Sequence, residues 1–227
     1  MNEYTLEITL LSDAAFSMGG GVSGLVDSEV QHDDLGLPVI SGRAIKGLLV
    51  TECAEILHAL PTTQKDRWQK TALRLFGKAG ETDDQPGGLW VGEATLLPDM
   101  AAHIRFDQKP SAADVLDSLT AIRTQTAMSE YGAPLDDTLR SLRVVMRGLT
   151  FYAPLHLDDG AGADERALLA ACALALRRAG LGRTRGKGKI QACITNRPLE
   201  PEAFATSEKT SKPLTGEWLQ PLKEALT

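Results

Sequence analysis

The stretch that decides the fold is GLGRTRGKGK, residues 180–189, which leads directly into the strand-like run Ile190–Ile194. Four glycines are interleaved with four cations, and no acidic residue occurs from Arg177 to Lys189. Glycine permits positive φ and close approach to a ligand, while successive N–H groups with neighbouring Arg and Lys side chains bind phosphate. The alternative is a flexible, solvated hairpin. We predict a loop that binds a phosphate backbone through Gly182, Arg183, Arg185, Gly186, Lys187 and Gly188.

The same stretch argues against a mononucleotide kinase or ATPase. A P-loop requires GxxxxGK followed by Ser or Thr, and it lies between a strand and a helix. Here three residues separate Gly182 from Gly186, and Gly188 follows the lysine. The order is also reversed, because a helical pattern precedes this loop and a strand pattern follows it.

The composition favours one large domain, or one domain with a tail, because the chain has 227 residues of which 43% are apolar. The formal net charge of −6 argues against general affinity for nucleic acid. Six cations nevertheless fall within residues 177–189, and the acids concentrate elsewhere. This segregation indicates one basic groove on an otherwise acidic protein.

The three cysteines, Cys53, Cys172 and Cys193, form no CxxC pair and lie in apolar surroundings. They indicate buried thiols in a reducing compartment. The four histidines show no spacing typical of metal ligands. Because the sequence has no long apolar run and no signal peptide, we expect a cytoplasmic protein without a membrane partner.

A second anion site is predicted at the start of a helix. Ser41 is a suitable N-cap, and apolar residues from Ile45 to Leu60 recur at helical spacing. The first turn then holds Gly42, Arg43 and Lys46. Cations are normally disfavoured at a helix N-terminus, whose free N–H groups attract anions, so their presence indicates a bound anion. We expect this turn and residues 182–188 to converge on one ribose–phosphate track.

The remaining patterns predict an α+β fold. Strands are expected at residues 3–11, 88–97, 141–153 and 189–195, and further helices at 63–76, 112–119 and 164–179, the last capped by Gly180. This order indicates a ferredoxin-like, split βαβ core, shared with RNA-recognition domains, although the base-stacking aromatic motif of those domains is absent.

The predicted domain comprises residues 1–195, with an inserted excursion at 98–140. Residues 123–133 show neither helical nor strand periodicity, so we expect an exposed segment there. Residues 196–227 are predicted to be a C-terminal tail, with Trp218 and Leu219 docking a short final helix onto this domain or onto a neighbour. A glycine-rich loop at 17–24 is expected to wrap a ligand.

Several segments resemble the RAMP superfamily, and more specifically the backbone subunit of type III CRISPR effector complexes. The resemblance begins with GLVDSEV at 24–30, Asp33 and GLPVISGRAIKG at 36–47. It continues in the expected order through Leu75–Gly77, the strand Leu89–Leu97, Arg147–Phe151 and the glycine loop, and it covers about residues 3–195.

The resemblance implies an RNA-binding subunit of an antiviral ribonucleoprotein. Its partners would be the CRISPR guide RNA, the target RNA, further copies of itself or related RAMP subunits, and other effector subunits. In the family a protruding thumb displaces one nucleotide at regular intervals, and target RNA pairs in between. We expect that thumb around Arg123–Gly132, with Arg123 and Met128 contacting RNA. Arg43, in the SGRA tract that replaces the usual PGSS-like tract, would bind phosphate in a bidentate manner.

The resemblance also implies that Asp27 is catalytic, because catalytic members cut target RNA with an aspartate at this position. A carboxylate in a glycine-rich loop can hold hydrated Mg²⁺ or another divalent cation, which stabilises charge on the scissile phosphate while the ribose 2′-OH attacks. Metal-dependent endoribonuclease activity is therefore expected. The alternative interpretation of the spacing is that Asp27 makes only an Asx-turn.

Two other functions stay open. A non-catalytic scaffold that holds guide RNA differs from the ribonuclease only in the role of Asp27. A CRISPR RNA-processing endonuclease of the same superfamily generally relies on a histidine, and the histidines near the N-terminus have no evident partner.

Overall fold

The computed structural model describes residues 2–22, 24–78, 86–107, 110–127, 129–135, 138–200, 202 and 212–225. The elements follow one another as β1 Asn2–Leu10, α1 Gly42–Ala59, α2 Thr62–Phe76, β2 Leu89–Val91, α3 Pro98–Asp107, α4 Ala112–Leu119, β3 Thr120–Gln125, β4 Arg140–Val145, β5 Thr150–Leu157, α5 Ala163–Ala175, β6 Ile190–Thr195, α7 Thr215–Trp218 and α8 Gln220–Ala225.

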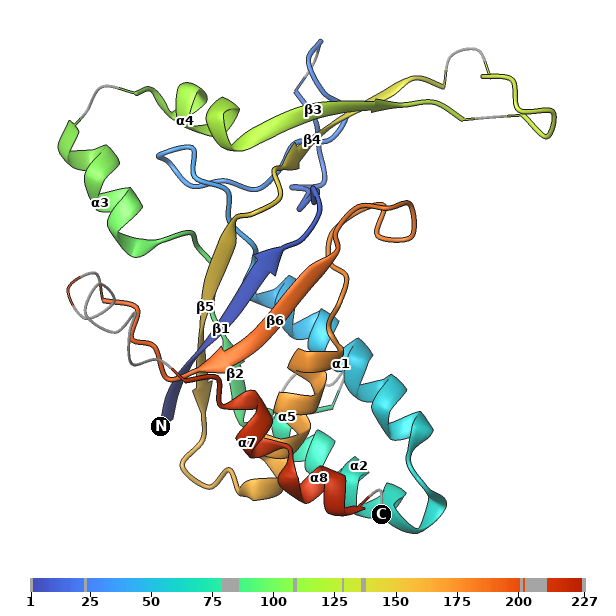
Figure 1. The fold of residues 1–227 in the computed structure, drawn as a ribbon, viewed down its shortest axis with the longest axis vertical. Coiled ribbons are helices and arrows are strands. Elements are labelled where there is room, and N and C mark those ends of the chain that lie inside the picture. The colour runs from blue at the N-terminus through green and yellow to red at the C-terminus, as the bar shows by residue number, and fades with distance from the viewer. Residues whose placement is uncertain are drawn as a thin grey trace.

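The core is an antiparallel sheet in the order β2-β5-β1-β6. Alternate residues of β1, namely Leu6, Ile8 and Leu10, are buried, as its predicted period of two requires. They belong to the same hydrophobic core as Leu49 of α1 and Leu168 of α5. Figure 1 shows α1, α2 and α5 grouped together beside this sheet.

Two helical connections interlock in the sheet. β1 leads through α1 and α2 to β2, and β5 lies between the two strands. β5 leads through α5 to β6, and β1 lies between them. Each connection therefore joins parallel strands separated by one antiparallel strand, as in a split βαβ unit. The predicted α+β class is confirmed.

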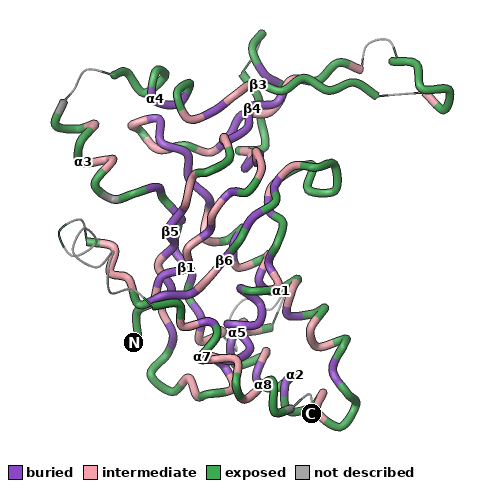
Figure 2. Tube along the Cα trace, in the orientation of Figure 1, coloured by how far each residue is buried: buried purple, intermediate pink, exposed green. Residues whose placement is uncertain are grey.

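The segment inserted between β2 and β5 contains α3, α4 and a hairpin formed by β3 and β4. We call β3, β4 and the residues that connect them the thumb hairpin. Its strands pair from Thr120 opposite Val145 to Gln125 opposite Arg140. The hairpin extends away from the sheet, and its outer part is exposed (Figures 1 and 2).

This hairpin corrects the expectation that residues 123–133 have no strand. β3 continues to Gln125, but its last residues are exposed, so no apolar alternation marks them in the sequence. The helix Pro98–Asp107 has no counterpart among the predicted elements either. The predicted helix at 112–119 is confirmed.

The predicted end of α5 is wrong. The helix stops at Ala175 with Leu176 as its C-cap, rather than continuing to Ala179 with Gly180 as cap. Residues 177–179 instead pair with the far side of the glycine loop, because the Ile190 N–H donates to the Arg177 carbonyl at 2.9 Å. Gly180 has φ +84°, and a Cβ there would lie 2.6 Å from the Ala15 carbonyl oxygen.

The C-terminal helices α7 and α8 dock on the same domain. The rings of Tyr4 and Trp218 meet edge to face with centroids 4.7 Å apart, and Leu222 is buried. The expectation that Trp218 docks a short final helix is thus confirmed. No helix in the described part of the chain is long and apolar enough to cross a membrane.

Candidate nucleic-acid interface

The glycine loop, residues 180–188, closes as a tight hairpin. The Ala179 N–H donates to the Gly188 carbonyl at 2.8 Å, and the Arg178 guanidinium donates to the Arg183 carbonyl at 2.6 Å. Gly182, Gly186 and Gly188 all have φ between +67° and +78°. Residues 181–186 are exposed, which leaves the Arg183 and Arg185 side chains open to solvent, while the Arg185 N–H donates within the loop to the Gly182 carbonyl at 2.8 Å. Anion binding by this loop stays a prediction.

The loop is anchored to the chain that follows β1. The Leu181 N–H donates to the Ala15 carbonyl, and the Gly188 N–H donates to the Asp13 carbonyl, each at 2.8 Å. These bonds hold the glycine loop next to the base of the thumb hairpin, because Ala14 in turn exchanges backbone hydrogen bonds with Val145 of β4.

Asp27 lies in a small hollow beside this loop, which we call the Asp27 hollow. Its volume is about 210 Å³, and it is lined by Asp27, Ser28, Gln125, Arg140, Ser141, Leu142, Leu181, Gly182 and Lys187. The Asp27 carboxylate is exposed and accepts a hydrogen bond from the Ser141 N–H at 2.6 Å. The Asp27 N–H donates to the Ser141 carbonyl at 2.8 Å, so β4 fixes both the backbone and the side chain.

A second hollow, which we call the Arg123 hollow, shares Lys187 with the first. Its volume is about 630 Å³, and its lining is Leu11, Ser12, Asp13, Arg123, Met146, Arg147, Gly186 and Lys187. Arg123 and Asp13 form an ion pair at 2.8 Å. The remaining cations give this hollow a net positive lining suited to a phosphate group.

Asp13 is stabilised as a carboxylate in that hollow. Burial raises its pKa, but the hydrogen bond from Arg123, a further bond from the Arg147 N–H and both guanidinium charges outweigh burial. The pKa of Asp13 therefore lies below its ordinary value. Arg123 is partly neutralised by this pair, and its guanidinium remains half exposed.

The structure thus brings Asp27, Arg123, Gly182, Gly186 and Lys187 to neighbouring surfaces. Lys187 lines both hollows, and its ammonium lies 3.5 Å from the Gln125 side-chain oxygen. Arg183 and Arg185 are exposed on the loop, Gly188 is buried, and Met128 lies outside the described residues. Sequence reasoning missed Arg140, the first residue of β4, and Arg147, which lies between β4 and β5, because only the fold brings them to the two hollows.

The first turn of α1 does not line either hollow. Ser41 caps the helix as predicted, since its hydroxyl accepts from the Ala44 N–H at 3.3 Å. A Cβ on Gly42 would lie 2.1 Å from the Val91 carbonyl oxygen, so glycine lets the helix approach the edge of the sheet. Arg43 is exposed.

Lys46 points to the sheet rather than to the loop. Its ammonium donates to the Leu89 carbonyl at 2.9 Å, and burial lowers its pKa.

The part of α1 near the glycine loop is its third turn. There burial and Glu55 raise the pKa of Glu52, and the charges of Arg183 and Arg177 oppose this rise. Convergence of residues 42–46 and 182–188 on one track stays a prediction.

A metal ion at Asp27 would have few protein ligands. No group of three or more His, Cys, Asp or Glu side chains that could hold a metal occurs in the described ranges. Mg²⁺, however, keeps several waters and commonly uses only one or two carboxylates. The exposed Asp27 carboxylate, with one oxygen bonded to Ser141, fits such a hydrated ion.

Comparisons with solved structures show the fold. One similar chain comes from a cryo-EM structure of the type III-B Cmr-beta complex bound to cognate target RNA; it is 13% identical, with a TM-score of 0.63 over 86% of this chain and 97% of that one. Another, from the apo state of Cmr-beta, is 14% identical, with a TM-score of 0.60 over 84% and 96%.

No curated protein sequence matches the chain. The family model of the RAMP superfamily matches residues 7–191, which is most of the 227-residue sequence and includes both hollows and the thumb hairpin. This chain belongs to the RAMP superfamily.

Proposed function

We propose that this chain is a backbone subunit of a type III CRISPR ribonucleoprotein, where it binds guide RNA and cuts paired target RNA with Asp27. Membership of the RAMP superfamily and likeness to chains of the Cmr-beta complex support the role of a subunit. The observation that carries the proposal is the Asp27 hollow, where an exposed carboxylate lies beside the glycine loop and the thumb hairpin.

Guide binding is assigned to the cationic surface around Lys187. Arg123, Arg147 and Lys187 line one hollow, and Arg140 and Lys187 line the other. Arg183 and Arg185 extend the charge along the exposed loop. Such a surface binds the sugar–phosphate backbone whatever the base sequence, as a guide-holding subunit requires.

Cleavage is assigned to the Asp27 hollow. The Ser141 N–H orients the carboxylate, and Lys187 and Arg140 supply positive charge near a phosphate placed there. Asp27 would hold a hydrated divalent cation, which supplies charge stabilisation at the scissile phosphate when bound. The thumb hairpin beside the hollow would hold the displaced nucleotide, so that each copy of the subunit cuts at one position.

Replacing Asp27 by Asn tests the catalytic role. In complexes assembled with guide RNA, Asp27→Asn should lower target-RNA cleavage by at least ~10²-fold, as loss of a catalytic group does, while target binding stays unchanged. Asp34→Asn is the matched control, because Asp34 is an exposed acid that lines neither hollow. Cleavage at the wild-type rate and spacing in Asp27→Asn would exclude this residue as catalytic.

A non-catalytic scaffold is the second candidate, and one observation favours it. The paired bonds between Asp27 and Ser141 join the 24–30 loop to β4, which is a structural role in itself. If the wild-type complex binds guide and target but cuts neither, the scaffold is the better assignment.

A further inference from the structure

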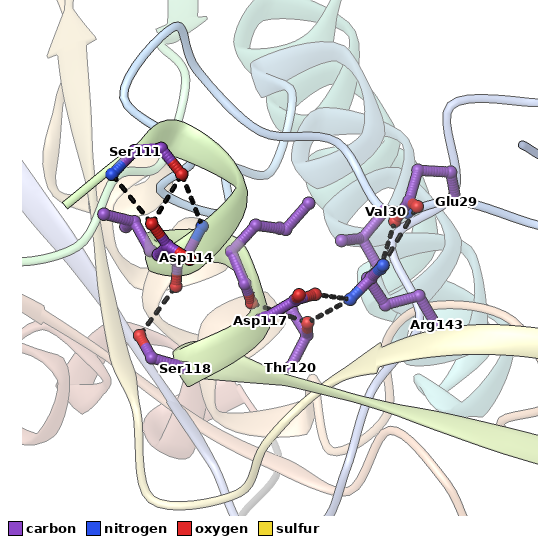
Figure 3. A network of polar contacts seen from close by, with 10 residues as sticks. Glu29, Val30, Ser111, Asp114, Asp117, Ser118, Thr120 and Arg143 are labelled. Atoms are coloured by element: carbon purple, nitrogen blue, oxygen red, sulfur yellow. Dashed lines mark hydrogen bonds and ion pairs between the residues drawn. The ribbon is translucent and has the colours of Figure 1, made fainter. Parts of the chain in front are cut away.

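A buried arginine on β4 lies at the centre of a polar network (Figure 3), and its chain neighbour Leu142 lines the Asp27 hollow. Arg143 is 6% exposed, and its Nε lies 3.0 Å from a carboxylate oxygen of Glu29, which is 7% exposed. Its Nη1 donates to Asp117 at 2.6 Å and to the Thr120 hydroxyl at 3.0 Å. A buried charge requires such partners, because desolvation of an unpaired one costs several kcal/mol.

The four residues come from different parts of the chain. Glu29 belongs to the loop that carries Asp27, Asp117 to α4, and Thr120 to the start of β3. Glu29 also accepts a hydrogen bond from the Val30 N–H at 2.8 Å, which fixes the carboxylate within its own loop. One guanidinium therefore ties the Asp27 loop to both strands of the thumb hairpin and to the helix that precedes it.

The backbone shows how this tie reaches Asp27. Residues 27–29 run parallel to β4, with Ser28 bridged to Leu142. The Arg143 N–H donates to the Ser28 carbonyl at 3.0 Å, two residues along β4 from the Ser141 N–H that holds the Asp27 carboxylate. The pair of Arg143 and Glu29 adds a side-chain contact beside these backbone bonds, so its loss should loosen the hold of β4 on the loop.

We propose that Arg143 is a positioning residue that holds the Asp27 carboxylate at a fixed place relative to the thumb hairpin. The inference rests on the proposed function, because it assigns the place of the cut to this tie. Arg143 touches no RNA in this scheme, and the cations around Lys187 are separate from its network. Its loss should lower the rate of cutting and blur the cut position, but leave guide and target binding intact.

The test uses assembled complexes carrying Arg143→Lys, which keeps the charge but loses the planar fork, and Glu29→Gln, which keeps the shape but loses the charge. Asp34→Asn is the control, because Asp34 is an exposed acid outside this network. For each variant we measure four quantities: the rate of single-turnover cleavage at saturating target RNA, the Kd for target RNA, the position of the cut, and hydrogen exchange of residues 24–30.

We expect Arg143→Lys and Glu29→Gln to cut about 10- to 100-fold more slowly, since a displacement of about 1 Å can cost that much. Target Kd should change less than about twofold, cuts should spread over neighbouring positions, and exchange of the 24–30 loop should rise. Wild-type rate, cut position and exchange in both variants would overturn the positioning role.

Asp27→Asn is measured in parallel to separate the two proposals. If Asp27→Asn abolishes cutting while both network variants cut like wild type, only the positioning role falls. If Asp27→Asn cuts like wild type, the catalytic assignment falls and the positioning role falls with it. Failure of both network variants to assemble, with Asp34→Asn assembling normally, would show a purely structural network and would also overturn the inference.

Discussion

At the scale of single residues, the glycines of the loop serve two different purposes. A Cβ on Gly188 would lie 1.9 Å from the Ala179 carbonyl oxygen, so the chain itself occupies the space that glycine leaves. A Cβ on Gly186 would meet nothing within 4 Å, although its φ is +78°. Gly186 thus leaves room for a ligand, whereas Gly188 closes the hairpin.

Alanine at these two positions should therefore have different effects on stability. Gly186→Ala should lower the free energy of unfolding by about 1–2 kcal/mol, the cost of a side chain in the left-handed region. Gly188→Ala must also displace the Ala179 carbonyl, and its loss should exceed ~4 kcal/mol, the range of severe core defects. Urea denaturation of the two variants measures both values, and equal losses would contradict the close packing at Gly188.

The sequence predicts some of these residue roles and not others. Asp27, Gly182 and Lys187 are predicted site residues that do line one hollow. Arg143 carries a signal that sequence reasoning left unused, a charge flanked by Leu142 and the buried pair Val144–Val145. The contact of Lys46 with the Leu89 carbonyl leaves no local signal, because it depends on where α1 crosses β2.

At the scale of elements, the base of the thumb hairpin is tied to the end of β1 by the pair of Asp13 and Arg123. The pKa of Asp13 is lowered in the folded protein, because the bonds from Arg123 and Arg147 outweigh the effect of burial. A carboxyl group whose folded pKa is depressed adds stability above its unfolded pKa. That contribution is lost as the pH falls through the folded value.

Acid should consequently weaken the wild-type protein more than an Asp13→Asn variant. Between pH 5 and pH 3, the wild type should lose about 0.5–1 kcal/mol more, a small value because the pair is partly exposed and screened. Free energies of unfolding at both pH values, from urea titrations, provide the measurement. Equal acid losses in the two proteins would mean that this pair does not stabilise the hairpin.

Elements are predictable where burial alternates with exposure. The helix α1 follows from Ser41 and its apolar stripe, and β1 follows from its alternation. The thumb hairpin does not, because Arg123–Gln125 are exposed and the pairing partner lies beyond a long connection. The early end of α5 depends likewise on the hydrogen bond from the Ile190 N–H to the Arg177 carbonyl, which local propensity does not encode.

At the scale of the whole molecule, charge is distributed unevenly. The protein carries a net charge of −6, yet the loop and the two hollows gather Arg123, Arg140, Arg147, Arg183, Arg185 and Lys187. An acidic protein that binds RNA only here should depend on the position of its cations and not on their sum. Two double variants with the same change in net charge can separate these possibilities.

Arg183→Glu with Arg185→Glu reverses two exposed cations of the loop, and Lys65→Glu with Lys70→Glu reverses two cations of α2. Each phosphate contact with single-stranded RNA contributes about 0.7 to the slope of log K against log salt. The loop variant should bind RNA more weakly, and the magnitude of its slope should fall by about 1.4, because two phosphate contacts disappear. The α2 variant should keep the wild-type slope. If the two variants lose affinity and slope equally, RNA senses only the total charge of the protein, and the glycine loop is not its binding site.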